Sequence, residues 1–261
     1  MTFDLDSFRL DGKVAVVTGA GGRENSIGRA YAMGLAKAGA ALMIADRNHA
    51  GAERVADEIR AQGGTAFAVA ADIADPASVA GMAAAVEARF GGADILVNNA
   101  AIMAEMTMAK AIDYPLADWQ RMLTVNLTGA LLCCQAIVPQ MRARGGGRIV
   151  NQVSAGAYPA KSVYGITKLA LVGLTTTLAS ELGREGINVN AIAPGSCATD
   201  ARDSMTRSPE MVQHMERVVT MRYEGRPDEL VGALLLLCSP AGSWVHGQVL
   251  HVDGGAHAGK W

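Results

Sequence analysis

The sequence has no large excess of charge of either sign. Its 23 Lys and Arg residues nearly balance 25 Asp and Glu residues, which leaves a formal net charge of −2. Proteins that bind nucleic acids neutralise phosphates with an excess of Lys and Arg, so we expect no nucleic-acid partner. Long hydrophobic runs are missing too: the longest aliphatic stretch, around Leu234–Cys238, is far shorter than the ~20 residues that cross a bilayer. Residues 1–13 carry three Asp residues and do not read as a signal peptide, so we expect no membrane partner.

Cysteine is scarce. The four residues are Cys133, Cys134, Cys197 and Cys238. The side chains of the adjacent pair diverge on a helix, so we interpret all four cysteines as buried free thiols. Free thiols are typical of a reducing compartment, which indicates a cytoplasmic protein. The five histidines show no spacing typical of metal ligands, so we expect no metal site.

A regular alternation of short apolar runs and longer amphipathic stretches fills the chain. The apolar runs predict strands and the amphipathic stretches predict helices. The predicted strands cover 13–18, 41–45, 66–71, 94–97, 148–153, 187–193 and 248–252. The predicted helices cover 27–39, 48–61, 76–90, 115–144, 161–184 and 227–238.

This strand–helix alternation predicts a parallel sheet with helices on both faces, because right-handed crossovers place them there. The expected fold class is therefore α/β, a three-layer, doubly wound sheet. No Pro/Ser-rich linker or charge block divides the chain, so residues 1–261 are expected to form one domain. Ligands of such sheets bind beyond the carboxyl ends of the strands, where we look for a site.

The first strand ends in a Gly-rich turn that leads into a helix. Gly19 and Gly21 lie in this turn, and Ser26 and Ile27 begin the helix. Glycines let the backbone approach a pyrophosphate, and free N–H groups at the helix start attract its negative charge. A tight turn without a ligand is the alternative. The position between a first strand and a helix favours dinucleotide binding.

Acidic residues end the next two strands. Asp46 can accept both hydroxyls of an adenosine ribose and would repel a 2′-phosphate, which favours NAD over NADP. A plain turn residue or helix cap is the alternative for Asp46, and Arg47 or Arg23 could pair with a 2′-phosphate. Asp72 can accept from the adenine amino group, with Ile73 packing on the ring.

Tyr164 and Lys168 form a Tyr-x-x-x-Lys pair on a predicted helix, and Ser154 ends the strand before it. Further short motifs occur in order along the chain: Thr18-Gly19, Ile27-Gly28, Asn98-Asn99-Ala100-Ala101, Asn126, Pro194-Gly195 and Val252-Asp253-Gly254-Gly255. Together these motifs resemble the short-chain dehydrogenase/reductase family, from about Asp11 to Gly255. The resemblance implies a Rossmann fold and an NAD(P)-dependent enzyme that interconverts an alcohol and a ketone by hydride transfer.

The resemblance also implies roles for single residues. Asn126 would anchor a water that links Lys168 to solvent, and Lys168 would hold the nicotinamide ribose. Further cofactor contacts are expected from Asn99, Pro194, Cys197 and Thr199, with Thr199 beside the nicotinamide amide.

Tyr164 is the predicted general acid/base. Tyr164 and Lys168 lie on one helix face, and an ammonium about 4 Å from a phenol favours the phenolate by roughly 3 pK units before desolvation. We therefore expect the pKa of Tyr164 to move from about 10 toward the working pH. Ser154 is expected to donate a hydrogen bond to the substrate oxygen. An ordinary amphipathic pair on a surface helix is the alternative for Tyr164 and Lys168.

The chain departs from the family pattern in three places. The first turn is about three residues longer than usual, through residues 23–26. Ser154 lies ten residues before Tyr164, about three fewer than usual, and Ser162 is the other nearby hydroxyl. We keep Ser154, because Ser162 would point off the helix face of Tyr164. Ala101 replaces the usual glycine, a small change that should be tolerated.

The resemblance assigns a segment at about 196–226 to covering the substrate. Methionines gather there and in the 101–108 loop: Met205, Met211, Met215, Met221, Met103, Met106 and Met108. Methionine adapts to irregular apolar pockets, which favours a mainly apolar ketone or secondary alcohol; core packing or a subunit interface is the alternative. By analogy with the family, we expect a homotetramer.

Two other functions fit parts of the pattern. A catalytically silent nucleotide-binding regulator or scaffold of the same fold should lack part of the Ser154, Tyr164 and Lys168 set, which is complete here. A methyltransferase shares the Gly-rich turn and the acidic second strand end, but does not require the Tyr-x-x-x-Lys helix. An enoyl-reducing member is less expected, because that branch separates its Tyr and Lys more widely.

Overall fold

The computed structural model describes residues 4–103, 109–203 and 217–258. In these ranges seven strands form one parallel sheet in the order β3-β2-β1-β4-β5-β6-β7. The strands are β1 (Val14–Thr18), β2 (Ala41–Asp46), β3 (Ala66–Ala70), β4 (Ile95–Asn98), β5 (Gly147–Gln152), β6 (Ile187–Pro194) and β7 (Val249–Val252).

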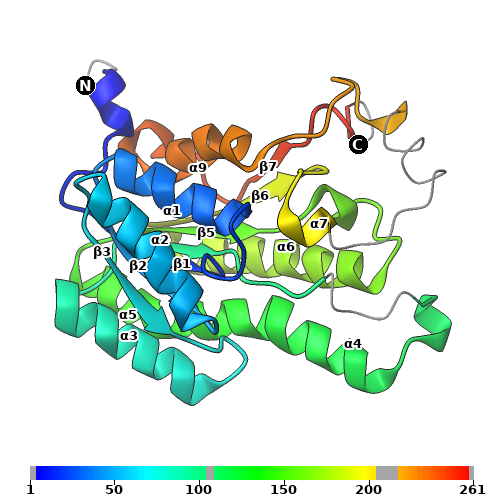
Figure 1. The fold of residues 1–261 in the computed structure, drawn as a ribbon, viewed down its shortest axis with the longest axis horizontal. Helices are drawn as coiled ribbons and strands as arrows, with labels where there is room; N and C mark the ends of the chain where they lie inside the picture. The colour runs from blue at the N-terminus through cyan, green and yellow to red at the C-terminus, as the bar shows by residue number, and fades with distance from the viewer. Residues whose placement is uncertain (1–3, 104–108, 204–216, 259–261) are drawn as a thin grey trace.

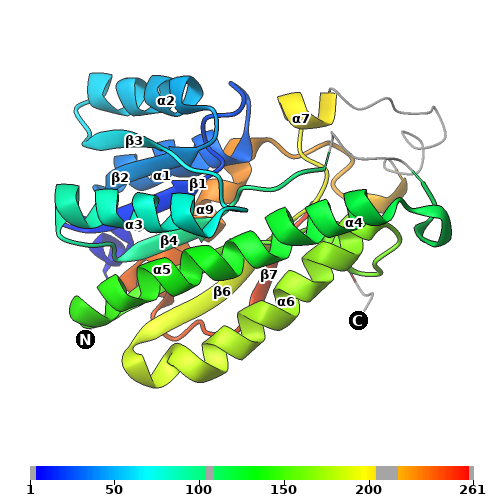
Figure 2. The ribbon, with the colours of Figure 1, turned by 90° about the horizontal axis from the view of Figure 1, so that it is seen from below.

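Helices cover both faces of the sheet (Figure 1). One face carries α1 (Ile27–Lys37), α2 (His49–Ala61) and α9 (Val231–Cys238); the other carries α3 (Pro76–Phe90), α5 (Gly129–Ala143) and α6 (Val163–Leu182). Figure 2 shows α5 and α6 side by side along the second face. The predicted three-layer, doubly wound α/β fold is confirmed.

Alternate residues of each strand supply the two cores. Ala15 and Val17 of β1 face the cluster beneath α1, α2 and α9, whereas Val14 and Val16 face the cluster beneath α3, α5 and α6. A strand buried on both faces is mostly apolar, as in the fully buried run Val14–Thr18 of β1. β5 and β6 also carry the buried Asn151 and Asn190, whose side chains donate hydrogen bonds to Thr175 Oγ1 and to the Val245 carbonyl. The four cysteines are buried and free, as predicted.

The predicted helix 115–144 is α4 (Leu116–Leu123) and α5, joined by a π-helical turn at Thr124–Thr128. The continuous stretch Leu116–Ala143, and likewise Val163–Glu185, is long and apolar enough to cross a membrane by length and composition alone. Core helices share that property, and these helices bury Ile137 and Leu178 against the sheet.

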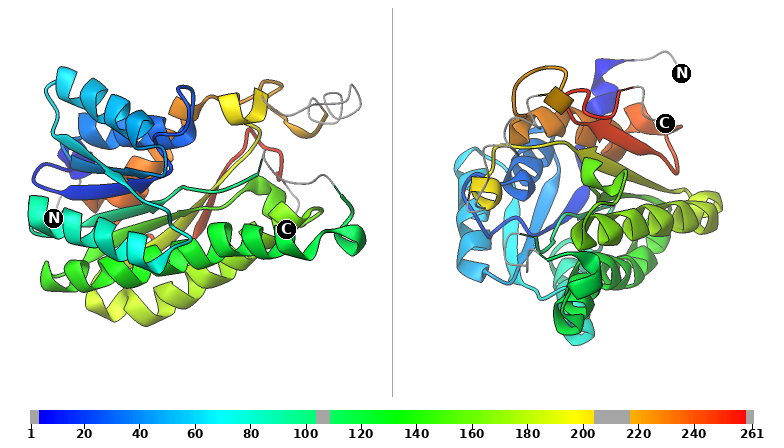
Figure 3. Two further views of the ribbon diagram at one scale, coloured as in Figure 1. Left: turned by 60° about the horizontal axis from the view of Figure 1, so that its bottom comes forward. Right: turned by 90° about the vertical axis from the view of Figure 1, so that its right-hand side faces the viewer.

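The order of the strands reverses between β1 and β4. The chain runs outward from β1 to β3 and returns to place β4 on the other side of β1, so connections leave the two strand ends in opposite directions. Hydrogen bonds hold these ends together: Asn99 Nδ2 donates to the carbonyls of Thr18 and Gly19, each at 2.9 Å, and Thr18 Oγ1 accepts from the Asn99 N–H at 3.1 Å. The left panel of Figure 3 shows the short helix α7 (Asp200–Asp203), drawn in yellow, at this end of the molecule.

Candidate active site

A cleft of about 310 Å³ opens at the carboxyl ends of the strands, where β1 and β4 diverge. Nine of the residues predicted from the sequence line it: Gly19, Ser26, Ile27, Asp46, Asp72, Ile73, Asn99, Tyr164 and Thr199. The strand order places Asp72 and Asp46 toward one end and Tyr164 toward the other. The cleft is therefore elongated along the sheet edge, which suits an extended ligand.

The start of α1 forms the middle of the cleft. Ser26 caps this helix, since its Oγ accepts the N–H of Arg29 at 3.3 Å. Gly19 has a φ of +72°, and a Cβ on Gly28 would overlap the carbonyl oxygen of Gly19. The turn therefore needs glycine at both positions to bring the first N–H groups of the helix to the cleft, where they can bind an anion.

Asp46 is held by the turn itself. Its Oδ2 accepts the Gly21 N–H and its Oδ1 accepts the Asn48 N–H, both at 2.8 Å. A carboxylate has about four acceptor positions, so further hydroxyl donors can still bind. Gly21 does not line the cleft: a Cβ there would overlap the backbone of Ala52 in α2. Gly21 thus positions Asp46 and packs the turn on α2.

The longer turn binds the segment that follows β6. Asn25 N donates to Asp200 Oδ2 at 2.8 Å, and Asn25 Nδ2 donates to the Ala198 carbonyl at 2.9 Å. The Asp200 N–H returns a bond to the Asn25 carbonyl at 3.0 Å, and Arg23 Nη1 donates to the Asp200 carbonyl at 3.0 Å. The extra residues therefore connect the first turn to residues 198–200. We call this set of contacts the turn–segment bridge.

Tyr164 and Lys168 lie in the first turns of α6. Lys168 is 2% exposed, its Nζ donates to the Gln152 carbonyl at 2.8 Å, and Nζ lies 5.6 Å from the centre of the Tyr164 ring. Ser162 caps α6, because its Oγ accepts the Gly165 N–H at 3.0 Å. Ser154 Oγ accepts a backbone N–H in the same way, so the choice of Ser154 over Ser162 stays a prediction.

The pKa shifts correct one expectation. Burial raises the pKa of Tyr164 well above its ordinary value, and burial lowers the pKa of Lys168 to about 7. Losing water destabilises the charged form of each group, and this effect exceeds the attraction between them. An ammonium about 4 Å from the phenol, with desolvation as the smaller effect, predicts a lowered pKa for Tyr164. That prediction is wrong for the protein without bound cofactor, in which burial raises this pKa.

Ser154 follows β5 and is half-buried. Its Oγ accepts the Gly156 N–H at 3.0 Å, which leaves the hydroxyl proton to be donated elsewhere. The turn after Ser154 packs tightly on α6, since a Cβ on Gly165 would lie 2.6 Å from the Gly156 carbonyl oxygen. This close approach fixes the position of the turn that carries Ser154 relative to the helix that carries Tyr164.

Asn126 lies in the π-helical turn and is 1% exposed. Its Oδ1 accepts the Ile102 N–H at 2.9 Å, and its Nδ2 donates to the Ile102 carbonyl at 3.1 Å and to Thr167 Oγ1 at 3.2 Å. The side chain connects the loop after β4 to the residue preceding Lys168. Its predicted role in holding a water stays a prediction.

Four predicted cofactor contacts do not line the cleft: Gly21, Lys168, Pro194 and Cys197. Pro194 is buried at the end of β6, paired with Val252. Cys197 is buried beside Gly225 and lines a separate cavity. Sequence reasoning missed Gln152, which lines the cleft and whose carbonyl holds Lys168; no motif marks it. It also missed the partner of the longer turn, Asp200, although the extra length of the turn was itself a signal.

Comparisons with known proteins agree with this geometry. A family model described as enoyl-(acyl carrier protein) reductase matches residues 21–257. The 7alpha-hydroxysteroid dehydrogenase of Escherichia coli K12 is 39% identical over 256 residues, covering 97% of this chain and 97% of that protein.

Two solved structures have the same architecture. One is a 7alpha-hydroxysteroid dehydrogenase complexed with NADH and 7-oxo glycochenodeoxycholic acid, with a TM-score of 0.89 and 38% identity, covering 97% of this chain and 98% of that one. The other is a gluconate 5-dehydrogenase from Burkholderia cenocepacia in complex with NADP and tartrate, with a TM-score of 0.90 and 37% identity, also covering 97% and 98%. The chain belongs to the short-chain dehydrogenase/reductase family and is a nicotinamide-dependent oxidoreductase that acts on alcohol or ketone carbons.

Proposed function

We propose that the cleft binds NAD in preference to NADP, with the adenosine half beside Asp46 and Asp72 and the nicotinamide half beside Tyr164 and Thr199. The residues fit such a ligand: acidic acceptors lie at one end, and a helix N-terminus lies in the middle. A Cβ on Gly22 would meet only Asp46 Oδ2, at 3.9 Å, so the turn leaves room beside the helix start. The assignment of the nicotinamide half is carried by one observation: Tyr164, which lies beside the buried Lys168, lines this same cleft.

In the proposed mechanism, Tyr164 exchanges a proton with the substrate oxygen, while Ser154 donates its free hydroxyl proton to that oxygen. Bound nicotinamide supplies or accepts the hydride. With a pKa of about 7, Lys168 exchanges protons at neutral pH, and in its protonated form its charge favours the Tyr164 phenolate. Asn126 fits a positioning role, because it orients Thr167 beside Lys168.

Asp46→Ala is expected to shift coenzyme preference toward NADP. Removing the carboxylate removes both the ribose acceptor and the repulsion of a 2′-phosphate, while Arg47 at the cleft remains to pair with that phosphate. We expect the ratio of kcat/KM for NAD to kcat/KM for NADP to fall about 10- to 100-fold, as a change of about 1.4–2.8 kcal/mol would produce. Steady-state kinetics with both coenzymes measure this ratio. Glu87→Ala, which removes an exposed carboxylate of α3, is the control for the loss of one negative charge. An unchanged coenzyme ratio in Asp46→Ala would refute the role assigned to the Asp46 carboxylate.

Asn25→Ala is expected to speed the release of reduced coenzyme. The variant loses the side-chain bond to Ala198 and weakens the turn–segment bridge, at a cost of about 0.5–1.5 kcal/mol. Stopped-flow displacement of NADH should show a dissociation rate about 2- to 10-fold faster than in the wild type. Glu24→Ala changes an exposed neighbour in the same turn and should leave the rate unchanged. Equal rates in all three proteins would show that the bridge does not restrain the cofactor.

The substrate is proposed to be a mainly apolar ketone or secondary alcohol. The ring of Tyr164 packs on an apolar cluster of Ile102, Met122 and Val163, with Trp119 and Tyr114 beside it. Met103 lines the cleft, whereas Met205, Met211, Met215, Met106 and Met108 lie outside the described residues. The two relatives with bound ligands differ here, since one holds a bile acid and the other a small polyhydroxy acid, tartrate. Turnover of small polar sugars alone, in a panel that includes apolar ketones, would refute the apolar class.

We retain the other sequence-based proposals. Residues 1–261 form one domain with a substrate-covering segment at about 196–226, and the protein is a cytoplasmic homotetramer with neither a nucleic-acid nor a membrane partner. The buried free cysteines support a reducing compartment. The four-residue separation of Tyr164 and Lys168 favours alcohol–ketone chemistry over enoyl reduction. No observation favours a silent regulator or a methyltransferase.

A further inference from the structure

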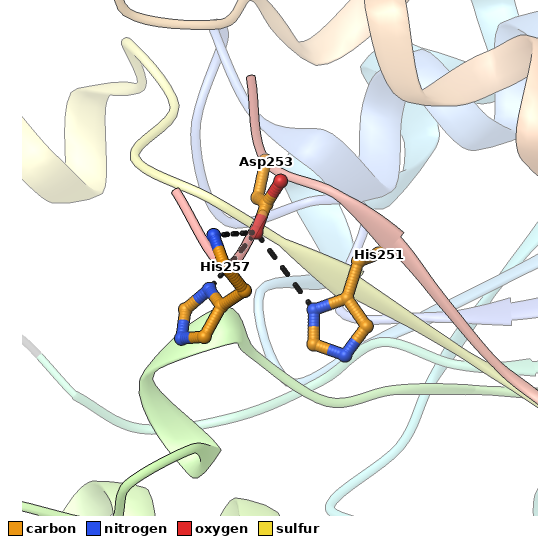
Figure 4. A group of neighbouring side chains, drawn as sticks. All are labelled: His251, Asp253 and His257. Atoms are coloured by element: carbon orange, nitrogen blue, oxygen red, sulfur yellow. Dashed lines mark hydrogen bonds and ion pairs between the residues drawn. The ribbon is translucent and has the colours of Figure 1, made fainter. Parts of the chain in front are cut away.

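Two imidazoles and one carboxylate converge near the C-terminus, outside the residues that line the cleft. His251 lies in β7, and Asp253 and His257 follow it. Figure 4 shows both rings turned toward the Asp253 carboxylate, and the three candidate ligand atoms all lie within 4.8 Å of one another. Asp253 Oδ2 lies 2.9 Å from His257 Nδ1 and 3.8 Å from His251 Nδ1. The Asp253 side chain is only 7% exposed, so this is a recessed group rather than a solvated one.

The hydrogen bonds of His257 determine which ring nitrogen faces the carboxylate as an acceptor. His257 Nε2 makes a close contact with the Tyr158 carbonyl, which can only accept, so Nε2 carries a proton. In a neutral imidazole, Nδ1 then presents a lone pair to the Asp253 oxygen at 2.9 Å. Two lone pairs at this distance repel unless a cation, either a second proton or a metal ion, lies between them. A ring N–H bonded to a backbone carbonyl is also how metal-binding histidines are oriented.

His251 supplies an independent observation. Its Nδ1 is buried and has no hydrogen-bond partner among the described residues, because the 3.8 Å to Asp253 is too long for one. A buried nitrogen without a partner is costly, and a cation shared with Asp253 would satisfy it.

We propose that His251 Nδ1, Asp253 Oδ2 and His257 Nδ1 form a binding site for a divalent transition-metal ion, with Zn²⁺ the best fit. Two imidazoles and a carboxylate suit Zn²⁺ and its neighbours, whereas Mg²⁺ and Ca²⁺ prefer oxygen ligands throughout. Tetrahedral ligands at about 2.0–2.1 Å from zinc lie roughly 3.4 Å apart, between the 2.9 Å and 3.8 Å that separate Asp253 Oδ2 from the two Nδ1 atoms. All three atoms lie within 4.8 Å of one another, so binding would draw the two rings closer together. This proposal replaces the sequence-based expectation of no metal site, which considered histidine spacing alone. It does not depend on the proposed function of the cleft.

A bound metal ion would hold the loop between β5 and α6 in place. His257 contacts the carbonyl of Tyr158, which lies between Ser154 and Tyr164 in the chain. Because a metal ion would hold the His257 ring, it would also hold this loop in place. The site would be a positioning element, since none of its three residues lines the cleft.

Calorimetric titration of Zn²⁺ into chelator-treated, tag-free protein at pH 7.5 tests the proposal. We expect one ion bound per chain and a thermal midpoint raised by ~5–10 °C at 100-fold excess over Kd. His251→Phe keeps an aromatic ring at this position and breaks no hydrogen bond of the Nδ1 atom, so this variant should fold. His251→Phe and Asp253→Asn, each made singly, should weaken Zn²⁺ binding at least ~100-fold. His49→Ala, an exposed histidine of α2, is the matched control and should bind as the wild type does.

Two results would overturn the proposal. One is the absence of stoichiometric binding at 100-fold molar excess of Zn²⁺. An NMR signature of doubly protonated His257 would then identify a proton as the cation between the ring and the carboxylate. The other is stoichiometric binding that His251→Phe leaves unchanged, because the ion would then lie elsewhere. Neither result bears on coenzyme binding in the cleft, which the Asp46→Ala ratio tests separately.

Discussion

Tyr164→Phe is expected to lower kcat by ~100- to 10,000-fold while dinucleotide affinity stays within about 2-fold of the wild type. Phenylalanine keeps the ring against Ile102, Met122 and Val163, so the apolar packing survives. What disappears is the hydroxyl at the cleft that exchanges a proton with the substrate oxygen, and general acid/base catalysis is worth about 10²–10⁴ in rate. The experiment follows the absorbance of reduced coenzyme for turnover and its fluorescence for binding.

Tyr158→Phe is the matched control for Tyr164→Phe. Tyr158 lies in the loop between β5 and α6, and it contacts His257 through its backbone carbonyl, which the substitution preserves. Its kcat should remain within about 3-fold of the wild type, since its hydroxyl has no assigned part in the reaction. If Tyr164→Phe retained more than a tenth of the activity, proton transfer would have to be assigned to another group.

Lys168→Met is expected to change both activity and the pH dependence of stability. The substitution keeps an unbranched chain as far as Cε and removes the ammonium group, which should lower kcat at least ~100-fold through loss of phenolate stabilisation. The stability effect follows from the lowered pKa of Lys168, about 7 in the folded protein against 10.5 for the unperturbed group. Between these values the unfolded chain binds more protons than the folded one, so the free energy of unfolding rises with pH.

Denaturant unfolding at pH 7 and pH 9 measures this effect. For the lysine alone, the free energy of unfolding should rise by about 2 kcal/mol over this interval, and Lys168→Met should lose that rise. Buried cysteines oppose the trend near pH 9, because burial raises the pKa of Cys133, Cys134 and Cys238 to about 12. They are common to both proteins, so the difference between the two pH profiles isolates Lys168. Identical profiles would mean that Lys168 is not buried as a neutral amine near pH 7.

The fold was predictable because its determinants are local. The strands of a doubly covered parallel sheet are mostly apolar, and the run Val14–Val17 is apolar in sequence and buried in structure. The i, i+4 spacing of Tyr164 and Lys168 likewise survives because helix geometry fixes it. The positions of Asp46 and Asp72 at the cleft followed from their place at strand ends.

What could not be predicted depends on contacts between distant parts of the chain. Asn25 and Asp200 are 175 residues apart, and nothing local to either indicates the other. The sequence also places Gly21 in a phosphate turn without revealing that α2 packs on it. The direction of the Tyr164 pKa shift required knowing how much water burial removes, which residue spacing does not state.

The bond network between residues 23–25 and 198–200 has a kinetic consequence. Arg23 on one side and Thr199 on the other both line the cleft, where we propose that the dinucleotide binds, and Thr199 lies in the segment proposed to cover the substrate. A displacement wide enough to free the coenzyme must also break contacts on the substrate side. In the proposed arrangement, coenzyme release and exposure of the substrate are therefore coupled, because the same bonds must open for both.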